Sequence, residues 1–164
     1  MGNKTTRSRY ASKVAHGFGG ASWRESSVSP GGTQGQGDRS VAGQGRRRVL
    51  VVEDEALICV ETADTLERQG FDVHLALSGE DALRRLRGGL RVDILFTDIN
   101  LAGPMDGAAL ARLARDLNPR LVVVYTSGTV ETVAQPVSGA TFVAKPYSPD
   151  RVGRLLHGMA GATV

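Results

Sequence analysis

The chain has 164 residues, which is room for one domain of ordinary size. Its charge is unevenly distributed along the sequence. Residues 1–48 contain nine basic and two acidic residues, whereas residues 49–164 contain eleven basic and fifteen acidic residues. The formal net charge of +3 therefore describes neither part, and the composition excludes a nucleic-acid-binding protein that is basic throughout.

Residues 1–45 are predicted to form a disordered tail. They hold ten of the 21 glycines, are rich in serine and arginine, and include the turn sequence Pro30-Gly31-Gly32. They carry too few apolar groups to offset the entropy lost on ordering. The basic run Arg46–Arg48 is interpreted as a solvated junction that flanks the first strand. The folded domain is predicted to cover residues 46–164.

From Val49 onward, short apolar runs alternate with helical patterns. The run Val49–Val52 is typical of a parallel strand buried on both faces. Next, Leu57, Val60 and Leu66 lie at helical spacing within 56–69, and Gly70 ends that helix. Further strands are predicted at 73–77, 92–97, 121–126 and 140–144, and further helices from the N-cap Ser78 to Arg87, from Asp106 to Leu117, and from Ser148 or Asp150 to Met159.

This alternation predicts an α/β fold: a flavodoxin-like, doubly wound sheet of five parallel strands in the order 2-1-3-4-5. In such a sheet the functional site lies at the carboxyl ends of the strands. The residues that directly follow each strand are therefore the candidates for function.

The remaining composition excludes several other classes. Cys59 is the only cysteine, so a disulfide framework and a multi-cysteine zinc site are excluded, and its apolar helical surroundings predict a buried, inert thiol. No apolar run approaches the ~20 residues that span a bilayer, and no hydrophobic signal core opens the chain. We therefore expect a cytoplasmic protein that does not associate with membranes.

Acidic, hydroxyl and basic residues follow four of the predicted strands. Glu53-Asp54-Glu55 follow the first, Asp98 the third, Thr126-Ser127 the fourth and Lys145 the fifth. Carboxylates crowded at one edge repel each other and need a cation, for which Mg²⁺ is the natural choice. The metal and Lys145 would make the site attractive to phosphate, and one carboxylate could act as nucleophile. The pattern predicts phosphoryl transfer to an aspartate.

Four segments carry a clear resemblance to a known family. VLVVEDE (49–55), FTDINLAGPMDG (96–107), VYTSG (124–128) and TFVAKPY (141–147) resemble the receiver domain of two-component response regulators. The resemblance covers residues 47–160 and none of the tail. It implies that Asp98 accepts a phosphoryl group from the phosphohistidine of a sensor histidine kinase or a histidine phosphotransfer protein.

The same resemblance implies a magnesium site. Asp54 and Asp98 would bind Mg²⁺ through their side chains, and the backbone carbonyl of Asn100 would supply a third ligand. Glu53 replaces the aspartate that is more frequent in the family and would act mainly through a bound water.

Further residues are assigned to the phosphoryl group and to the switch by resemblance. Lys145 would pair with the phosphoryl group, Ser127 would turn to bond it, and Phe142 would change rotamer. Thr126 is the neighbouring alternative. Ser127 is favoured because a small residue is expected directly after the switch residue, and Gly128 follows Ser127. Pro146 matches the family's Lys-Pro step, whose peptide is typically cis.

One segment departs from the usual family pattern. Only residues 128–139 separate the fourth and fifth strands, and they contain Pro136 and Gly139, so a full fourth helix hardly fits. The chain resembles stand-alone receivers in which that helix is reduced. We therefore do not expect the usual dimer surface of the family, and we expect a monomer.

The favoured function is a single-domain response regulator in a phosphorelay that signals to a downstream protein by a conformational switch. Its only chemistry would be its own phosphorylation and dephosphorylation, so it would not be an enzyme. One alternative is a phosphatase with an aspartate nucleophile and Mg²⁺. That class requires Asp-x-Asp after the first strand, whereas here Glu53 and Asp54 are adjacent. A flavin-binding module would require a neutral phosphate-binding loop after the first strand, where this chain has three acidic residues. A receiver that controls nucleic-acid binding by the basic tail is the third alternative, although the tail lacks basic repeats interleaved with aromatic residues.

Overall fold

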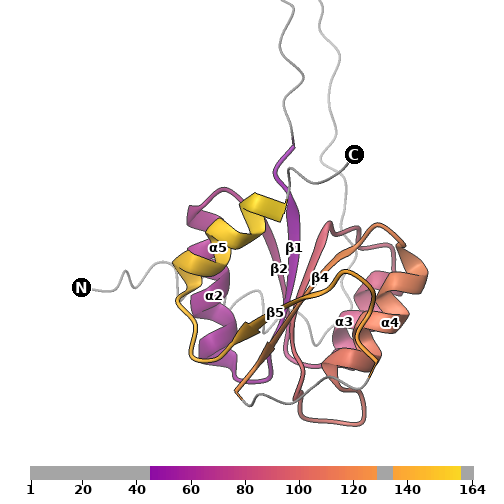
Figure 1. The fold of residues 1–164 in the computed structure, drawn as a ribbon. Coiled ribbons are helices and arrows are strands. Elements are labelled where there is room, and N and C mark those ends of the chain that lie inside the picture. The colour runs from indigo at the N-terminus through magenta and orange to yellow at the C-terminus, as the bar shows by residue number, and fades with distance from the viewer. Residues whose placement is uncertain (1–44, 129–134, 160–164) are drawn as a thin grey trace, which may run out of the picture. The chain divides into compact units, whose positions relative to one another are not determined.

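A computed structural model describes residues 45–128 and 135–159, in which five parallel strands form one sheet in the order β2-β1-β3-β4-β5 (Figure 1). This confirms the predicted fold class. The predicted disordered tail, apart from Gly45, lies outside the described residues. The strands are β1 (Arg48–Val52), β2 (Asp72–Ala76), β3 (Ile94–Asp98), β4 (Val122–Ser127) and β5 (Thr141–Ala144), and the helices are α2 (Ala56–Arg68), α3 (Gly79–Arg87), α4 (Gly107–Leu117) and α5 (Pro149–Gly158).

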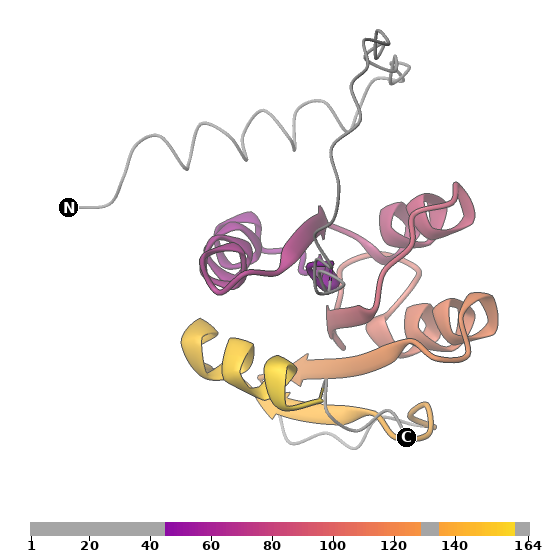
Figure 2. The ribbon, with the colours of Figure 1, turned by 90° about the horizontal axis from the view of Figure 1, so that it is seen from above.

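The helices cover the sheet in two layers. Helices α2 and α5 lie on one face and α3 and α4 on the other (Figures 1 and 2). The central strands β1 and β3 are buried almost throughout, as their continuous apolar runs predict. All neighbouring strands pair in parallel, so their carboxyl ends lie at one edge of the sheet.

The side chains of the N-cap residues stabilise the first turns of α3 and α4. Ser78 Oγ accepts a hydrogen bond from Asp81 N at 3.2 Å, and Asp106 Oδ1 accepts one from Ala109 N at 2.6 Å. For α5, the structure selects Ser148 as the cap, with Pro149 as the first helical residue. In the described part of the chain, no helix has the length and apolar character needed to cross a membrane.

Some details differ from the sequence prediction, and the bounds of the strands shift by one or two residues. Leu57 is not on the buried face of α2 and is 74 % exposed. The helix instead buries the stripe that contains Cys59, Ala63 and Leu66, because that side faces the sheet. The third strand begins at Ile94 and not at 92, and the carbonyl of Val92 accepts a hydrogen bond from the Asn118 side chain.

The thiol of Cys59 is buried in the layer between α2 and the sheet, as predicted. Burial, with a further contribution from the Glu53 carboxylate, raises its pKa to about 12. At pH 8 only about one thiol in ten thousand would then be ionised. We expect no reaction with Ellman's reagent in the native protein over a time in which the urea-unfolded protein reacts fully. Immediate labelling of the native protein would contradict this.

Candidate functional site

Polar side chains from four strands meet at the carboxyl edge of the sheet. Glu53 and Asp54 directly follow β1, Asp98 ends β3, Ser127 ends β4, and Lys145 directly follows β5. The parallel pairing of β1, β3, β4 and β5 aligns these strand ends. The residues that the sequence analysis selected one by one thus lie at a single edge, where doubly wound sheets carry their sites.

Glu53, Asp54 and Asp98 form a compact acidic cluster. One carboxylate oxygen from each lies within 4.8 Å of those from the other two. Glu53 and Asp98 are buried, whereas Asp54 is half-buried. Asp98 Oδ1 accepts a hydrogen bond from Asn100 N at 3.0 Å, and Asp54 Oδ2 accepts one from Ala102 N at 3.3 Å. Backbone donors of the loop after β3 therefore hold two of the three carboxylates.

The ammonium group of Lys145 lies between two of these carboxylates. Its Nζ donates to Asp98 Oδ2 at 2.5 Å and to Glu53 Oε2 and Oε1 at 2.8 and 3.1 Å. Burial acts to lower the pKa of Lys145, but its hydrogen bonds to Asp98 and Glu53 outweigh burial and hold that pKa above its usual value. Burial raises the pKa of Glu53, and the nearby Lys145 opposes this rise. Lys145 is therefore charged at neutral pH and offsets one negative charge of the cluster.

The charge that remains suits a divalent cation. Three carboxylates with one ammonium group carry a formal charge of −2 when all are ionised. Carboxylate oxygens are the ligands that Mg²⁺ prefers, and it usually keeps several waters. Asn100 is exposed, and its backbone nitrogen is hydrogen-bonded to the Asp98 carboxylate. The residues present at this edge therefore fit a bound Mg²⁺.

The two adjacent hydroxyl residues of β4 differ in their surroundings. Successive residues of a strand face opposite sides of a sheet. Thr126 is fully buried, and its hydroxyl has no hydrogen-bond partner among the described residues. Ser127 lies at the strand end, where its carbonyl accepts a hydrogen bond from Lys145 N at 2.7 Å. Ser127 is thus joined to the residue that pairs with Asp98, and its role as the switch residue stays a prediction.

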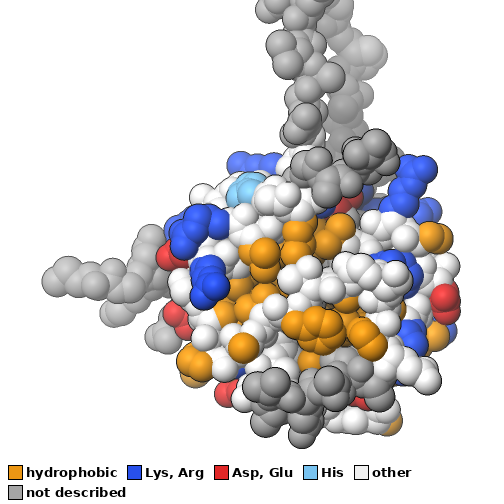
Figure 3. Space-filling view, viewed as in Figure 1, with side chains coloured by type: hydrophobic (Ala, Val, Ile, Leu, Met, Phe, Trp, Pro, Cys, Tyr) orange, Lys and Arg blue, Asp and Glu red, His pale blue; other side chains and the backbone are white. Residues whose placement is uncertain are grey.

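Phe142 lies on β5, the outermost strand of the sheet next to β4. Its side chain is 50 % exposed, and its ring packs on that of Tyr125 with centroids 5.2 Å apart. Tyr125 is fully buried, as its interpretation as strand packing requires. Figure 3 shows hydrophobic side chains gathered on the face over β5. Half of the Phe142 side chain is therefore open to solvent, and its change of rotamer stays a prediction.

The loop after β5 is anchored by an aromatic residue that the sequence analysis did not select. The peptide bond between Lys145 and Pro146 is cis. The hydroxyl of the next residue, Tyr147, lies 3.3 Å from that of Thr62, and its ring meets the ring of Phe96 edge-on, with centroids 5.5 Å apart. Tyr147 thereby connects this loop to α2 and β3. The available signal was an aromatic residue directly after the Lys-Pro step.

Gly107 is a second residue that the sequence analysis missed, and it packs directly against the backbone of Asp98. A Cβ at this position would lie 1.9 Å from the carbonyl oxygen of Asp98. Gly107 N also donates a hydrogen bond to Ile99 O at 2.9 Å. The sequence did offer a signal for this residue: a glycine stands at the first position of the helix, although most other residues favour helix formation more than glycine does.

The predicted reduction of the helix between β4 and β5 lies largely in residues 129–134, outside the described residues. Residues 135–139 are neither helix nor strand. Arg115 Nη1 donates a hydrogen bond to Ser138 O at 3.1 Å, so α4 contacts this segment directly.

The comparisons with known proteins agree with this geometry. A family model described as the response regulator receiver domain matches residues 49–157. The transcriptional regulatory protein ZraR of Salmonella typhimurium is 30% identical over 117 residues, which cover 69% of this chain and 26% of ZraR. The DNA-binding response regulator MtrA of Mycolicibacterium paratuberculosis is 34% identical over 107 residues, covering 63% of this chain and 47% of MtrA. This chain therefore matches about a quarter to a half of the length of these two relatives.

A solved structure shows the same fold. The crystal structure of a response regulator receiver protein from Sinorhizobium medicae superimposes with a TM-score of 0.66 at 28% identity. The match covers 71% of this chain and 96% of that protein. The likeness thus extends over nearly the whole of the solved receiver.

Proposed function

This chain belongs to the response regulator receiver family of two-component systems, and on that premise we propose that Asp98 is its phosphoacceptor. The phosphoryl donor is the phosphohistidine of a sensor histidine kinase or of a histidine phosphotransfer protein. The observation that carries the proposal is the contact of Lys145 Nζ with the Asp98 carboxylate inside a cluster of three carboxylates. Such a cluster places a nucleophile beside groups that bind a transferred phosphoryl group.

The transfer is a displacement at phosphorus by an oxygen of Asp98. The carboxylate oxygen attacks the phosphorus atom, the bond from phosphorus to the donor's imidazole nitrogen breaks, and its electron pair stays on that nitrogen. The product is an acyl phosphate on Asp98. Lys145 already lies at hydrogen-bond distance from this carboxylate, so its ammonium group is placed to pair with a phosphoryl oxygen.

Asp54, Asp98 and the backbone carbonyl of Asn100 would hold Mg²⁺, with Glu53 acting through a bound water. When bound, the ion would neutralise part of the negative charge that arises when a phosphoryl group approaches the three carboxylates. Glu53 additionally holds Lys145 by accepting hydrogen bonds of 2.8 and 3.1 Å from its ammonium group. Lys145 therefore needs no large movement to meet the incoming group.

The switch that follows uses the ends of β4 and β5. The hydroxyl of Ser127 turns toward the phosphoryl group, and Phe142 moves into the space that this turn vacates. The 50 % exposure of Phe142 and its packing on Tyr125 support a ring that can move without opening the core. The chain thus signals by a change of surface and turns over no substrate beyond its own acyl phosphate.

The proposed function is tested with the full chain, acetyl phosphate and Mg²⁺, followed by intact-mass measurement. We expect the addition of one phosphoryl group that alkali removes, and no addition when a chelator replaces Mg²⁺. Continued release of phosphate from p-nitrophenyl phosphate without stable labelling would favour the phosphatase alternative. Absence of labelling with both acetyl phosphate and phosphoramidate would contradict the proposal.

A further inference from the structure

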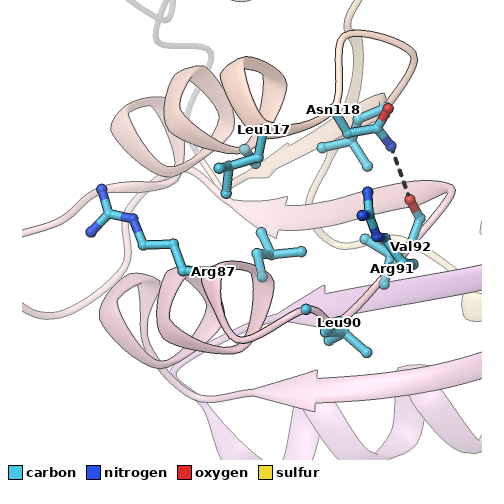
Figure 4. Close-up of a pocket in the computed structure, with 10 residues that line it drawn as sticks. Arg87, Leu90, Arg91, Val92, Leu117 and Asn118 are labelled. Carbon is cyan, nitrogen blue, oxygen red and sulfur yellow. Dashed lines mark hydrogen bonds between the residues drawn. The ribbon is translucent and has the colours of Figure 1, made fainter.

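A second feature lies at the opposite edge of the sheet from Asp98. A cavity of about 240 Å³ opens between the C-terminal ends of α3 and α4, next to the starts of β3 and β4 (Figure 4). Its apolar wall is contributed by Leu86, Leu90, Val92, Ala114, Leu117 and Leu121. Nothing in the proposed phosphoryl chemistry uses this pocket.

The mouth of the pocket exposes apolar surface. Leu117 is 48 % exposed, one of three large hydrophobic residues in the described ranges that are open to this degree. Figure 4 shows Leu117 on the α4 side of the pocket and Leu90 on the opposite side. The amide of Asn118 holds the wall in place by donating to Val92 O at 3.3 Å. This hydrogen bond connects the two sides of the pocket, and the mouth of the pocket retains apolar surface that a partner could bury.

Two arginines at the mouth are available to a ligand. Arg87 and Arg91 line the pocket on either side of it (Figure 4), and both side chains are exposed. Across residues 45–128 and 135–159, neither guanidinium forms an ion pair or hydrogen bond. By contrast, Arg84 and Arg85 on the same helix are both paired with Asp81, at 3.0 and 2.8 Å. The pocket thus combines an apolar wall with two unpaired cationic groups.

This basic mouth stands out against the charge of the chain around it. Residues 49–164 carry eleven basic and fifteen acidic residues, yet the residues that line the pocket include Arg87 and Arg91 and no acidic residue. An occupant that is acidic would find charge complementarity here. The chain's own residues 1–45, with six basic and two acidic residues, have the wrong sign to fill it.

The size of the pocket selects the kind of acidic occupant. Pockets that bury whole small molecules usually measure about 300–1,000 Å³. A cavity of about 240 Å³ is instead suited to one large side chain, and single buried anchors of this kind dominate many protein interfaces. The occupant therefore presents one large apolar side chain with carboxylates beside it.

We propose that this pocket docks an acidic peptide segment of a partner protein, with a leucine or aromatic side chain in the cavity and adjacent carboxylates on Arg87 and Arg91. Because the pocket lies at the far edge of the sheet from Asp98, docking is independent of the phosphorylation state. The proposal goes beyond the proposed function and does not depend on it.

The test uses the full-length protein and a displayed library of short random peptides. The library is selected on the unaltered chain and counter-selected on the double variant Arg87→Glu/Arg91→Glu. We expect enriched peptides in which one leucine or aromatic residue is flanked by Asp or Glu. In fluorescence anisotropy, the Kd of such a synthetic peptide should rise by at least about tenfold in the double variant, and also in Leu117→Asp.

The matched control is Arg151→Glu/Arg154→Glu, which makes the same change of net charge at two exposed positions of α5. It should leave the Kd unchanged, as should Asp98→Asn, which separates docking from the phosphoryl site. Peptides that bind the Arg87/Arg91 variant as well as the unaltered chain would overturn the proposal. So would a pocket that binds decanoate but no peptide, or a self-association in sedimentation that Arg87→Glu/Arg91→Glu abolishes.

Discussion

Replacing Asp98 with asparagine should eliminate phosphoryl incorporation from acetyl phosphate while leaving the protein folded. The amide is nearly isosteric with the carboxylate but lacks the charged oxygen that attacks phosphorus. The Glu53 carboxylate keeps its two hydrogen bonds with Lys145, so that ammonium group stays paired. The substitution also removes one of three crowded negative charges, so the melting temperature should be equal or higher.

The measurement is intact mass after incubation over a series of Mg²⁺ concentrations, with Asp54→Asn as the matched control. That variant also removes one negative charge from the cluster, but it keeps the nucleophile. We expect Asp54→Asn to accept a phosphoryl group only at higher Mg²⁺, because it weakens one metal ligand. Full labelling of Asp98→Asn, or loss of labelling in Asp54→Asn at every Mg²⁺ concentration, would contradict these assignments.

Replacing Gly107 with alanine should destabilise the fold by at least about 2 kcal/mol and slow the phosphorylation of Asp98. The added methyl group would lie 1.9 Å from the Asp98 carbonyl oxygen, which is a backbone atom that no side-chain rotation can move away. Either α4 or the end of β3 must shift. Because the Asp98 carboxylate is positioned by that same backbone, a shift of β3 also disturbs its contact with Lys145.

Urea unfolding of Gly107→Ala checks the stability, and initial rates of labelling check the site. Gly158→Ala is the matched control, because Gly158 is also helical and a Cβ there would meet nothing within 4 Å. The control should show unchanged or slightly higher stability, since alanine favours helix over glycine. A midpoint for Gly107→Ala equal to that of the control would show that the close approach is not rigid.

Much of the fold and of the site could be predicted from the sequence. The order of strands and helices follows from local signals: the buried run Val49–Val52 and the caps Ser78 and Asp106 act within a few residues of themselves. The alternation of elements predicts a parallel sheet, and parallel strands bring their carboxyl ends to one edge. That is why Glu53, Asp54, Asp98 and Lys145 could be assigned to one site before any contact was known.

Only the tertiary structure decided which way particular residues face. Leu57 and Cys59 are both apolar members of one helix, and the seating of α2 on the sheet buries the second and exposes the first. Thr126 and Ser127 are equivalent as hydroxyl residues, but the pleat of β4 sends them to opposite faces. Such choices depend on the rotation of an element against its neighbours, which local sequence does not specify.

The same holds for contacts between segments far apart in the chain. The closeness of Gly107 to the carbonyl of Asp98 and the pocket between the ends of α3 and α4 arise where separate elements pack together. Residue types and spacing predict an element and the edge to which it delivers a side chain. Distances, clashes and cavities depend on how the elements pack, and so the sequence determined the elements and the tertiary structure alone determined these contacts.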